Sequence, residues 1–112
     1  MLYKCNMYSE REYDGILKAM GHASRRKILD LIKDKPHTTM ELCLILKEMN
    51  RCTVMQHLNV LEKADLIIVK HSGKYRWNYI NLLPIKEIHD RWITKFSVDA
   101  IDLLTKLKQD MG

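Results

Sequence analysis

The stretch from residue 50 to residue 63 constrains the fold of this chain more than any other part of it. At about 100° per residue, a helix over this stretch has two unlike faces. One face is suited to packing and holds Val54, His57, Leu58 and Leu61. The other face holds Cys52, Met55, Gln56, Asn59 and Lys63. Asn50 is a suitable N-cap, so the pattern predicts a helix that buries one face and presents amides and a cation on the other.

A second short helix is predicted just before it, over residues 39–47. Thr39 is the expected N-cap, and Glu41 places a negative charge in the first turn, where it is favourable. The residues expected to face inward are Leu42, Ile45 and Leu46. Two short helices joined by about three residues form a helix-turn-helix.

A β-hairpin is predicted after the two helices. Residues 64–70 are rich in β-branched side chains, as a strand should be, and residues 71–74 form a turn with Gly73 at its tip. Residues 75–81 begin by alternating aromatic with polar side chains, which is the pattern of a half-buried strand. The basic residues around the tip are Lys70, His71, Lys74 and Arg76. In a winged helix such a hairpin lies along the backbone or minor groove of DNA; the alternative is an ordinary basic hairpin.

Two more helices are predicted at the start of the chain. Ser9 and Glu12 have the spacing of a capping box, and Gly21 is a suitable end, so the first helix should run from about residue 9 to residue 20. Its apolar residues at helical spacing are Tyr13, Ile16, Leu17 and Met20. Ser24 is expected to cap the next helix, which should continue to about Asp34. The residues that it should bury are Ile28, Leu29 and Ile32.

Positive charge is concentrated in one part of the chain. Residues 24–81 hold eleven Lys and Arg against six Asp and Glu, whereas residues 1–23 and 82–112 are each balanced, so this central segment carries the whole net charge of +5. Arg25 and Arg26 fall in the first turn of a predicted helix, where cations are unfavourable. Contact with DNA phosphates would explain their position; the alternative is a solvated basic surface.

A long last helix is predicted from about residue 84 to residue 109, with Pro84 in its first turn. About 25 residues would span about 37 Å at about 1.5 Å per residue, which is more than the central segment can cover. The apolar stripe of this helix contains Ile85, Ile88, Trp92, Phe96, Ile101, Leu104 and Leu107. Surplus apolar surface of this size usually marks an interface, so we expect a homodimer held by the terminal helices. The alternative is a terminal helix that folds back on its own domain.

Composition sets the outer bounds. A chain of 112 residues is expected to form one domain, organised as an N-terminal arm and dimerisation helix (1–23), a helix-turn-helix and wing (24–81) and a C-terminal dimerisation helix (82–112). No apolar run approaches the roughly 20 residues that span a bilayer, and the first residues do not form a signal peptide. Three cysteines without a C-x-x-C pattern do not make a disulfide framework. A cytoplasmic protein with reduced thiols is therefore expected.

Two stretches resemble the ArsR/SmtB family of winged-helix repressors. Residues 20–29, MGHASRRKIL, resemble the family's L-x-(D/H)-x-(S/T)-R-x-x-I-L opening. Residues 53–67, TVMQHLNVLEKADLI, resemble its recognition helix and exit, T-V-S-x-H-L-x-x-L-x-x-A-G-L-V. This sequence departs from the family at Met55, where serine is usual, at Asp65, where glycine is usual, and at Asn78, where the wing tyrosine is usual.

The resemblance implies a mainly α-helical winged helix-turn-helix with a β-hairpin wing, acting as a homodimeric repressor on a double-stranded, palindromic DNA operator. Family members leave the operator when an inducer binds, often a metal or metalloid. Here the inducer is unidentified, and a small-molecule inducer is one candidate partner. The residues expected to read bases are Met55, Gln56, Asn59 and Lys63. Those expected to contact phosphates are Arg25, Arg26, Arg51, Thr53, Lys74 and Arg76. Those expected in the dimer interface are Ile16, Leu17, Met20, Ile88, Trp92, Phe96, Ile101 and Leu104.

Other functions are weaker alternatives. Cys43 lies where many family members begin a C-x-C metal site, but Ile45 replaces the second cysteine, and Cys5 with Cys43 would give two ligands where three or four are needed. No metal or other cofactor is therefore expected, although a Cys5–Cys43 redox couple stays open. No catalytic cysteine or histidine arrangement and no glycine-rich phosphate loop is recognisable, so an enzyme is not expected. A winged helix used only for protein contacts is the stronger alternative.

Overall fold

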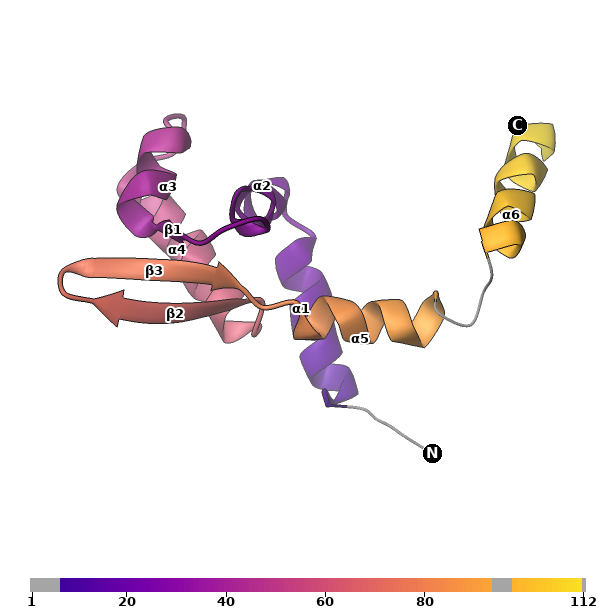
Figure 1. The fold of residues 1–112 in the computed structure, drawn as a ribbon, viewed down its shortest axis with the longest axis horizontal. Coiled ribbons are helices and arrows are strands. Elements are labelled where there is room, and N and C mark those ends of the chain that lie inside the picture. Colours follow the sequence, from indigo (N-terminus) through magenta and orange to yellow (C-terminus); the bar gives the residue numbers. More distant parts are fainter. Residues whose placement is uncertain (1–6, 94–97, 112) are drawn as a thin grey trace.

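The computed structural model describes residues 7–93 and 98–111, which form helices around a small antiparallel sheet (Figure 1). The helices are α1 (Glu10–Met20), α2 (Ala23–Ile32), α3 (Thr39–Ile45), α4 (Arg51–Lys63), α5 (Leu83–Trp92) and α6 (Val98–Met111). The strands are β1 (His37–Thr38), β2 (Ile67–Ser72) and β3 (Tyr75–Ile80), in the sheet order β1-β3-β2. This is a winged helix-turn-helix, as the sequence predicted.

The helix starts follow their capping residues. Ser9 caps α1 in a capping box with Glu12, as predicted. The predicted caps of the next two helices were wrong. His22 caps α2 instead of Ser24, because Nδ1 of His22 accepts from the amide of Ser24 at 3.2 Å. Thr38 caps α3 instead of Thr39 and forms a capping box with Glu41.

The helix-turn-helix consists of α3 and α4. Asn50 caps α4 as predicted, with Oδ1 accepting from the amide of Thr53 at 2.8 Å. α3 ends at Ile45, earlier than predicted, because Leu46 leaves the helical conformation, so five residues join the helices. Leu42 and Leu46 are buried, but Ile45 is 47% exposed, contrary to the prediction. An early end to α3 leaves Ile45 in its last turn, outside the core.

The core lies between α1, α2, α3, α4 and the sheet. Its buried apolar side chains are Tyr8, Tyr13, Ile16, Ala19, Ile28, Leu29, Ile32, Leu42, Leu46, Val54, Leu58, Leu61, Leu66 and Ile67. The packing face of α4 is fully enclosed, since Val54, Leu58 and Leu61 are each 0% exposed. Burying a leucine side chain contributes about 1.5–3 kcal/mol, so this face holds α4 firmly against the rest of the domain.

The wing is a two-residue hairpin. Ser72 pairs with Tyr75, which leaves Gly73 and Lys74 as the loop. Gly73 has φ 60°, and glycine at the first loop position suits a type II′ turn. β3 also pairs with β1, a two-residue strand that the sequence did not predict.

The two faces of β3 differ from the expected pattern. Its polar residue Asn78 is fully buried, whereas Tyr75 and Tyr79 are 43% and 39% exposed. β1 covers the edge of β3 beside Asn78, and the amide of this residue bonds across to it. The buried face of β3 is therefore the one that carries Asn78, and the exposed face carries the two tyrosines.

The predicted last helix is two helices. α5 ends at Trp92 and α6 begins at Val98. The sequence between them contains Ile93 and Thr94, whose β-branched side chains have low helix propensity. Phe96, expected on a continuous stripe, lies outside the described residues. Among the described helices, none combines the length and apolarity needed to cross a membrane.

Candidate DNA-binding surface

The exposed face of α4 carries the two amides that the sequence predicted to read bases. Gln56 and Asn59 are exposed, and no hydrogen bond occupies either side chain within the described residues. They lie about 60° apart around the helix, opposite the buried Leu58 and Leu61. Both amides are therefore free to bond to a partner surface.

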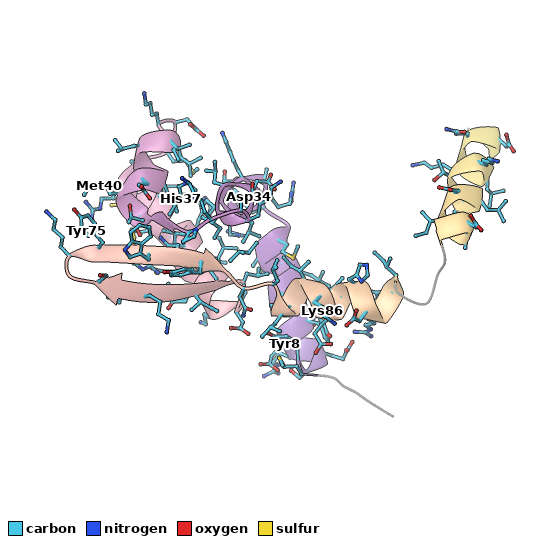
Figure 2. All side chains as sticks on the ribbon, viewed as in Figure 1. Tyr8, Asp34, His37, Met40, Tyr75 and Lys86 are labelled. Atoms are coloured by element: carbon cyan, nitrogen blue, oxygen red, sulfur yellow. The ribbon has the colours of Figure 1, made fainter. Side chains whose placement is uncertain are left out.

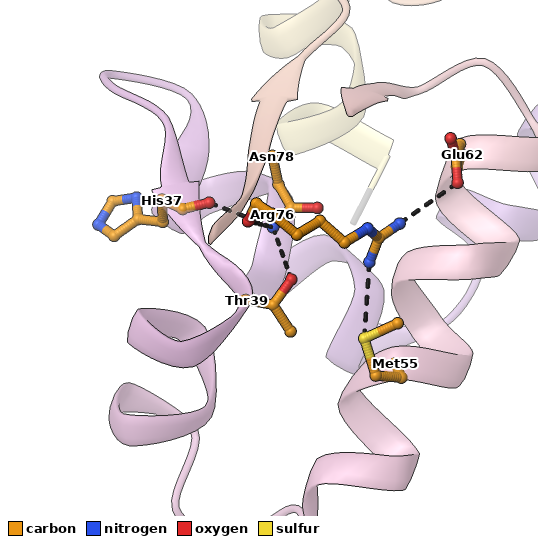
Figure 3. A network of polar contacts seen from close by, with 6 residues as sticks. All are labelled: His37, Thr39, Met55, Glu62, Arg76 and Asn78. Carbon is orange, nitrogen blue, oxygen red and sulfur yellow. Dashed lines mark hydrogen bonds and ion pairs between the residues drawn. The ribbon is translucent and has the colours of Figure 1, made fainter. Parts of the chain in front are cut away.

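Met55 does not stand free on this face. Its side chain is partly buried against the core, and its sulfur accepts a contact from Nη1 of Arg76 at 3.6 Å. Arg76 also donates from Nη2 to Oε1 of Glu62 at 3.2 Å (Figure 3). The side chain of Arg76 is 15% exposed. Arg76 thus ties the wing to α4, a role that the sequence analysis missed.

A buried amide fixes the other side of β3. Nδ2 of Asn78 donates to the carbonyl of His37 and to Oγ1 of Thr39, both at 3.2 Å (Figure 3). Within the described part of the chain, Oδ1 of Asn78 is buried without a hydrogen-bond partner. Asn78 therefore joins β3 to β1 and to the first turn of α3, at the position where the family usually has the wing tyrosine.

Arg25 and Arg26, in the first turn of α2, form hydrogen bonds to the end of α1. Nε of Arg25 donates to the carbonyl of Ala19 at 2.7 Å, and Nη1 of Arg26 donates to the carbonyl of Met20 at 2.8 Å. The last carbonyls of a helix lack intrahelical partners and carry partial negative charge. The two cations at the start of α2 thus stabilise the end of α1, an explanation that the sequence analysis did not consider. Arg26 is exposed, whereas Arg25 is partly buried.

The remaining predicted DNA contacts occupy three places. Arg51 and Thr53 lie in the first turn of α4, exposed and partly buried respectively, and Lys74 lies exposed in the wing loop. The ammonium of Lys74 is 5.6 Å from the ring centroid of Tyr75; Figure 2 shows Tyr75 near the tip of the hairpin. Lys63 is exposed in the last turn of α4, two turns beyond Gln56, and faces a cavity beside α1. It therefore lies one turn beyond Asn59, at the end of the helix.

A pair of histidines joins α2 to α4. The rings of His22 and His57 lie 4.7 Å apart, and Nη1 of Arg25 is 3.3 Å from Nδ1 of His57. Burial, and then the neighbouring positive charges of His22 and Arg25, lower the pKa of His57. The neutral imidazole of His57 can accept a hydrogen bond from the guanidinium of Arg25. His57 therefore helps to pack α4 against α2, the structural role expected from the sequence.

The end of α4 is held from two sides. Asp65 has φ 64°, and its carboxylate accepts from the hydroxyl of Tyr8 at 2.5 Å. Its carbonyl accepts from Nδ2 of Asn81 at 2.8 Å. The amide of Leu66 donates to the carbonyl of Leu61, which completes a Schellman motif. Asp65 therefore takes the left-handed position where the family usually has glycine.

The predicted dimer residues are divided between core and surface. Ile16 is 1% exposed and belongs to the core of its own protomer, and Ile88 also packs against that core. Nη1 of Arg91 forms an ion pair with Oε2 of Glu10 at 3.0 Å, so α5 folds back onto α1. Met20 is partly buried. The exposed members are Leu17 at 45%, Trp92 at 46%, Ile101 at 42% and Leu104 at 56%.

The cysteines form no described site. Cys43 is partly buried and Cys52 is exposed, both as free thiols, and Cys5 lies outside the described residues. In residues 7–93 and 98–111, no group of three or more His, Cys, Asp or Glu side chains is arranged to hold a metal ion. The Cys5–Cys43 redox couple therefore stays a hypothesis.

Known proteins share sequence similarity with this chain. A helix-turn-helix domain family matches residues 20–70. The chain is 37% identical over 86 residues to the uncharacterized HTH-type transcriptional regulator YuzN of Bacillus subtilis, covering 71% of this chain and 94% of that protein. It is 25% identical over 83 residues to the transcriptional repressor SdpR of the same organism, covering 74% and 90%.

Solved structures share the fold. An ArsR family transcriptional regulator superimposes with a TM-score of 0.69 at 24% identity, covering 79% of this chain and 89% of that one. Reduced HlyU from Vibrio cholerae does so with a TM-score of 0.62 at 21% identity, covering 76% and 93%. Fold and surface together define a winged helix-turn-helix protein whose second motif helix, α4, has a polar, exposed face. The chain belongs to the HTH-type transcriptional regulators, and its fold is that of the ArsR family regulators that it resembles.

Proposed function

We propose that the protein is a homodimeric repressor that reads a palindromic DNA operator with α4, grips the backbone with the wing, and leaves when a small-molecule inducer binds. The name of SdpR, a transcriptional repressor, supports repression over activation. The basic central segment supports DNA as the partner, because a concentrated positive charge favours binding to phosphates.

The observation that carries this proposal is the contrast between the two faces of α4. Leu58 and Leu61 are completely buried, which fixes the orientation of the helix, and Gln56 and Asn59 then project from its open side. An amide can pair bidentately with adenine in the major groove. A fixed helix with two free amides is suited to distinguishing sequences rather than to general attraction.

The proposed gripping residues lie on two elements of the helix-turn-helix and wing. Arg51 in the first turn of α4 and Lys74 in the wing loop are exposed cations. Contacts of this kind go to phosphates, which position the protein but carry no sequence information. Arg76, bonded to Glu62, is assigned to holding the wing rather than to gripping DNA.

The test is to select the preferred operator from random duplexes and then compare Gln56→Ala with wild type on that operator and on a scrambled duplex. We expect Gln56→Ala to lose on the order of 1–3 kcal/mol on the operator and much less on the scrambled duplex, because a base contact is lost. Gln109→Ala is the matched control, because it deletes the same exposed amide from α6.

Equal binding of wild type and Gln56→Ala to both duplexes would contradict reading by α4. A wild type that selects no sequence at all would favour the alternative, a winged helix that contacts protein. That alternative would use exposed apolar residues such as Met40 and Leu44 of α3, which are 57% and 65% exposed.

The dimer part of the proposal is supported by α6. Its side chains stand clear of the rest of the chain in Figure 2. The apolar ones are on one side, where Ile101, Leu103, Leu104 and Leu107 are 42%, 68%, 56% and 53% exposed. A stripe of this size is costly in water, and a second copy would cover it. Ile16 and Ile88 are left out of this interface because they pack inside the protomer.

Sedimentation equilibrium tests the dimer. We expect wild type to be a dimer at micromolar concentration and Leu104→Glu to be a folded monomer, because a charge in a buried apolar interface is strongly unfavourable. Lys106→Glu, on the opposite side of the same helix, should remain dimeric. A wild type that is a folded monomer, or a Leu104→Glu variant that dimerises as well as wild type, would contradict an interface at α6.

A further inference from the structure

A cavity lies between α1 and the C-terminal half of α4. Its volume is about 620 Å³, within the range of about 300–1,000 Å³ typical of small-molecule sites. Val60 and Lys63 of α4 and the following residue Ala64 line one side, and the other side is lined by α1. The cavity is therefore separate from the amides of Gln56 and Asn59 that are proposed to read DNA.

Gly15 places no side chain in this cavity. Glycine in the interior of a helix is unfavourable relative to alanine, because it loses more backbone freedom on folding. Gly15 nevertheless occupies the middle of α1, with no heavy atom within 4 Å of where a Cβ would stand and no left-handed backbone angle to explain it. Nothing in the packing of the described residues requires glycine here. Its effect is to leave room in the cavity.

The walls combine apolar surface with unpaired positive charge. Ile16, Ala19, Val60 and Ala64 supply aliphatic surface. Lys18 and Lys63 bring ammonium groups from α1 and α4, and within the described residues neither makes a hydrogen bond or ion pair.

The acidic groups at the cavity already have partners. Oε1 of Glu12 accepts from the amide of Ser9 at 2.8 Å, and Asp65 accepts from Tyr8. The guanidinium of Arg25 is engaged as well, on carbonyls of α1. The charged side chains around the cavity are three cations, Lys18, Arg25 and Lys63, and two carboxylates, Glu12 and Asp65. This net positive charge, with two lysines that have no partner among the described residues, favours an anion over a cation.

We propose that this cavity binds a small amphipathic organic anion, whose apolar body lies against the aliphatic walls and whose anionic group pairs with Lys18 and Lys63. Such a ligand would contact α1 and the end of α4 together. Because α4 carries the reading amides, occupancy changes how that helix is held, and the ligand is then the inducer. This second part rests on the proposed function; binding of the ligand itself does not.

The test uses 1-anilinonaphthalene-8-sulfonate, a fluorescent amphipathic anion, and the uncharged N-phenyl-1-naphthylamine, which has the same apolar body. Wild type should bind the sulfonate about tenfold more tightly than the neutral dye, a difference that Lys18→Gln should reduce. Lys106→Gln on α6 is the matched control and should behave as wild type. Equal binding of the two dyes to wild type would overturn the proposed anion selectivity.

A series at Gly15 locates the dye. Apolar dyes also bind exposed surfaces such as that of α6, so Gly15→Leu, which fills the cavity, is compared with Gly15→Ala, which hardly does. Both substitutions favour the helix, so both variants should fold. We expect Gly15→Leu to weaken sulfonate binding at least about tenfold and Gly15→Ala to retain most of it. Unchanged binding in Gly15→Leu would overturn the site.

Regulation is measured separately on the selected operator. The sulfonate should weaken operator binding by wild type and leave that of Gly15→Leu unchanged. If wild type selects no operator while the Gly15 and Lys18 results hold, the cavity stands and the proposed function fails. If the dye binds in the cavity and leaves operator affinity unchanged, the inducer role is overturned.

Discussion

The hydroxyl of Tyr8 donates to Oδ2 of Asp65 at 2.5 Å, across 57 positions of sequence. Asp65 is the non-glycine residue with positive φ among those described. The bond thus fastens the N-terminal segment to the turn that ends α4. It gives an aspartate a reason to occupy a position that glycine would fill with less strain.

Stability at alkaline pH should depend on this bond. Burial, the hydrogen bond to Asp65 and nearby carboxylates raise the pKa of Tyr8. The folded state therefore keeps the phenolic proton at pH values where the unfolded chain, with an ordinary tyrosine pKa of about 10, has lost it. The free energy of unfolding should fall as pH rises above about 10.

Urea denaturation of wild type and Tyr8→Phe between pH 8 and pH 11 measures this dependence. We expect Tyr8→Phe to be less stable at pH 8 and to lose less stability on going to pH 11. Tyr79→Phe, at an exposed tyrosine, is the control and should follow wild type. Parallel curves for wild type and Tyr8→Phe would show that Tyr8 titrates normally.

Substitutions at Asp65 should separate strain from bonding. Asp65→Gly loses the bond to Tyr8, worth about 1.5–3 kcal/mol because its acceptor is charged, but relieves a left-handed residue of about 1–2 kcal/mol, so its stability should fall only slightly below wild type. Asp65→Ala loses the bond and keeps the strain, so it should be the least stable of the three. Thermal denaturation ranks them, and an Asp65→Ala variant as stable as Asp65→Gly would contradict this account.

Mild acid should destabilise the fold through His57. Its pKa is lowered by burial and by the charges of His22 and Arg25. Below the ordinary histidine pKa of about 6.5 the unfolded chain binds a proton that the folded state resists, so stability should fall from pH 7 to pH 5. His57→Gln should flatten this fall when measured by urea denaturation, whereas His71→Gln, on the exposed wing, should not.

Substitution of the two wing cations, Lys74 and Arg76, should affect different properties, DNA binding and stability respectively. Lys74→Ala should weaken operator and scrambled DNA alike and reduce the log–log salt slope by about one unit, because one phosphate contact is lost. Arg76→Ala should lower the melting temperature instead, since Arg76 holds Met55 and Glu62. A double-mutant cycle of Arg76→Ala with Glu62→Ala should give a coupling of about 0.2–1 kcal/mol, as Glu62 is half exposed. Zero coupling would show that the ion pair does not hold the wing.

Periodicity in the sequence predicted the helices because their signals are local. The spacing of Val54, Leu58 and Leu61 defines a buried face without knowledge of its partner. β1 was missed because two residues carry no periodicity, and His37 and Thr38 become a strand only by pairing with β3. The break between α5 and α6 was missed because the apolar stripe continues in sequence while helix propensity falls near Ile93.

The candidate site was predicted less completely, for a related reason. The exposure of Gln56 and Asn59 was predicted correctly, because it follows from the helix period; their base-reading role stays a prediction. The partners of Arg25 and Arg76 lie on other elements, so their roles as a helix cap and a wing tie depend on the tertiary structure. A buried asparagine such as Asn78 gives one weak signal, a polar residue alternating with aromatics in a strand.

The loop of the hairpin consists of Gly73 and Lys74, and this short loop fixes the register of β2 against β3. One added residue that slid β3 by a single position would turn Asn78 to solvent and bury Tyr79, because neighbouring strand residues face opposite sides. Asn78 is bonded to β1 and α3, so such a slide would break contacts far from the insertion. Length changes in this wing that keep β3 paired with β1 must therefore bulge outward at the tip, so the buried amide of Asn78 sets the register of the hairpin.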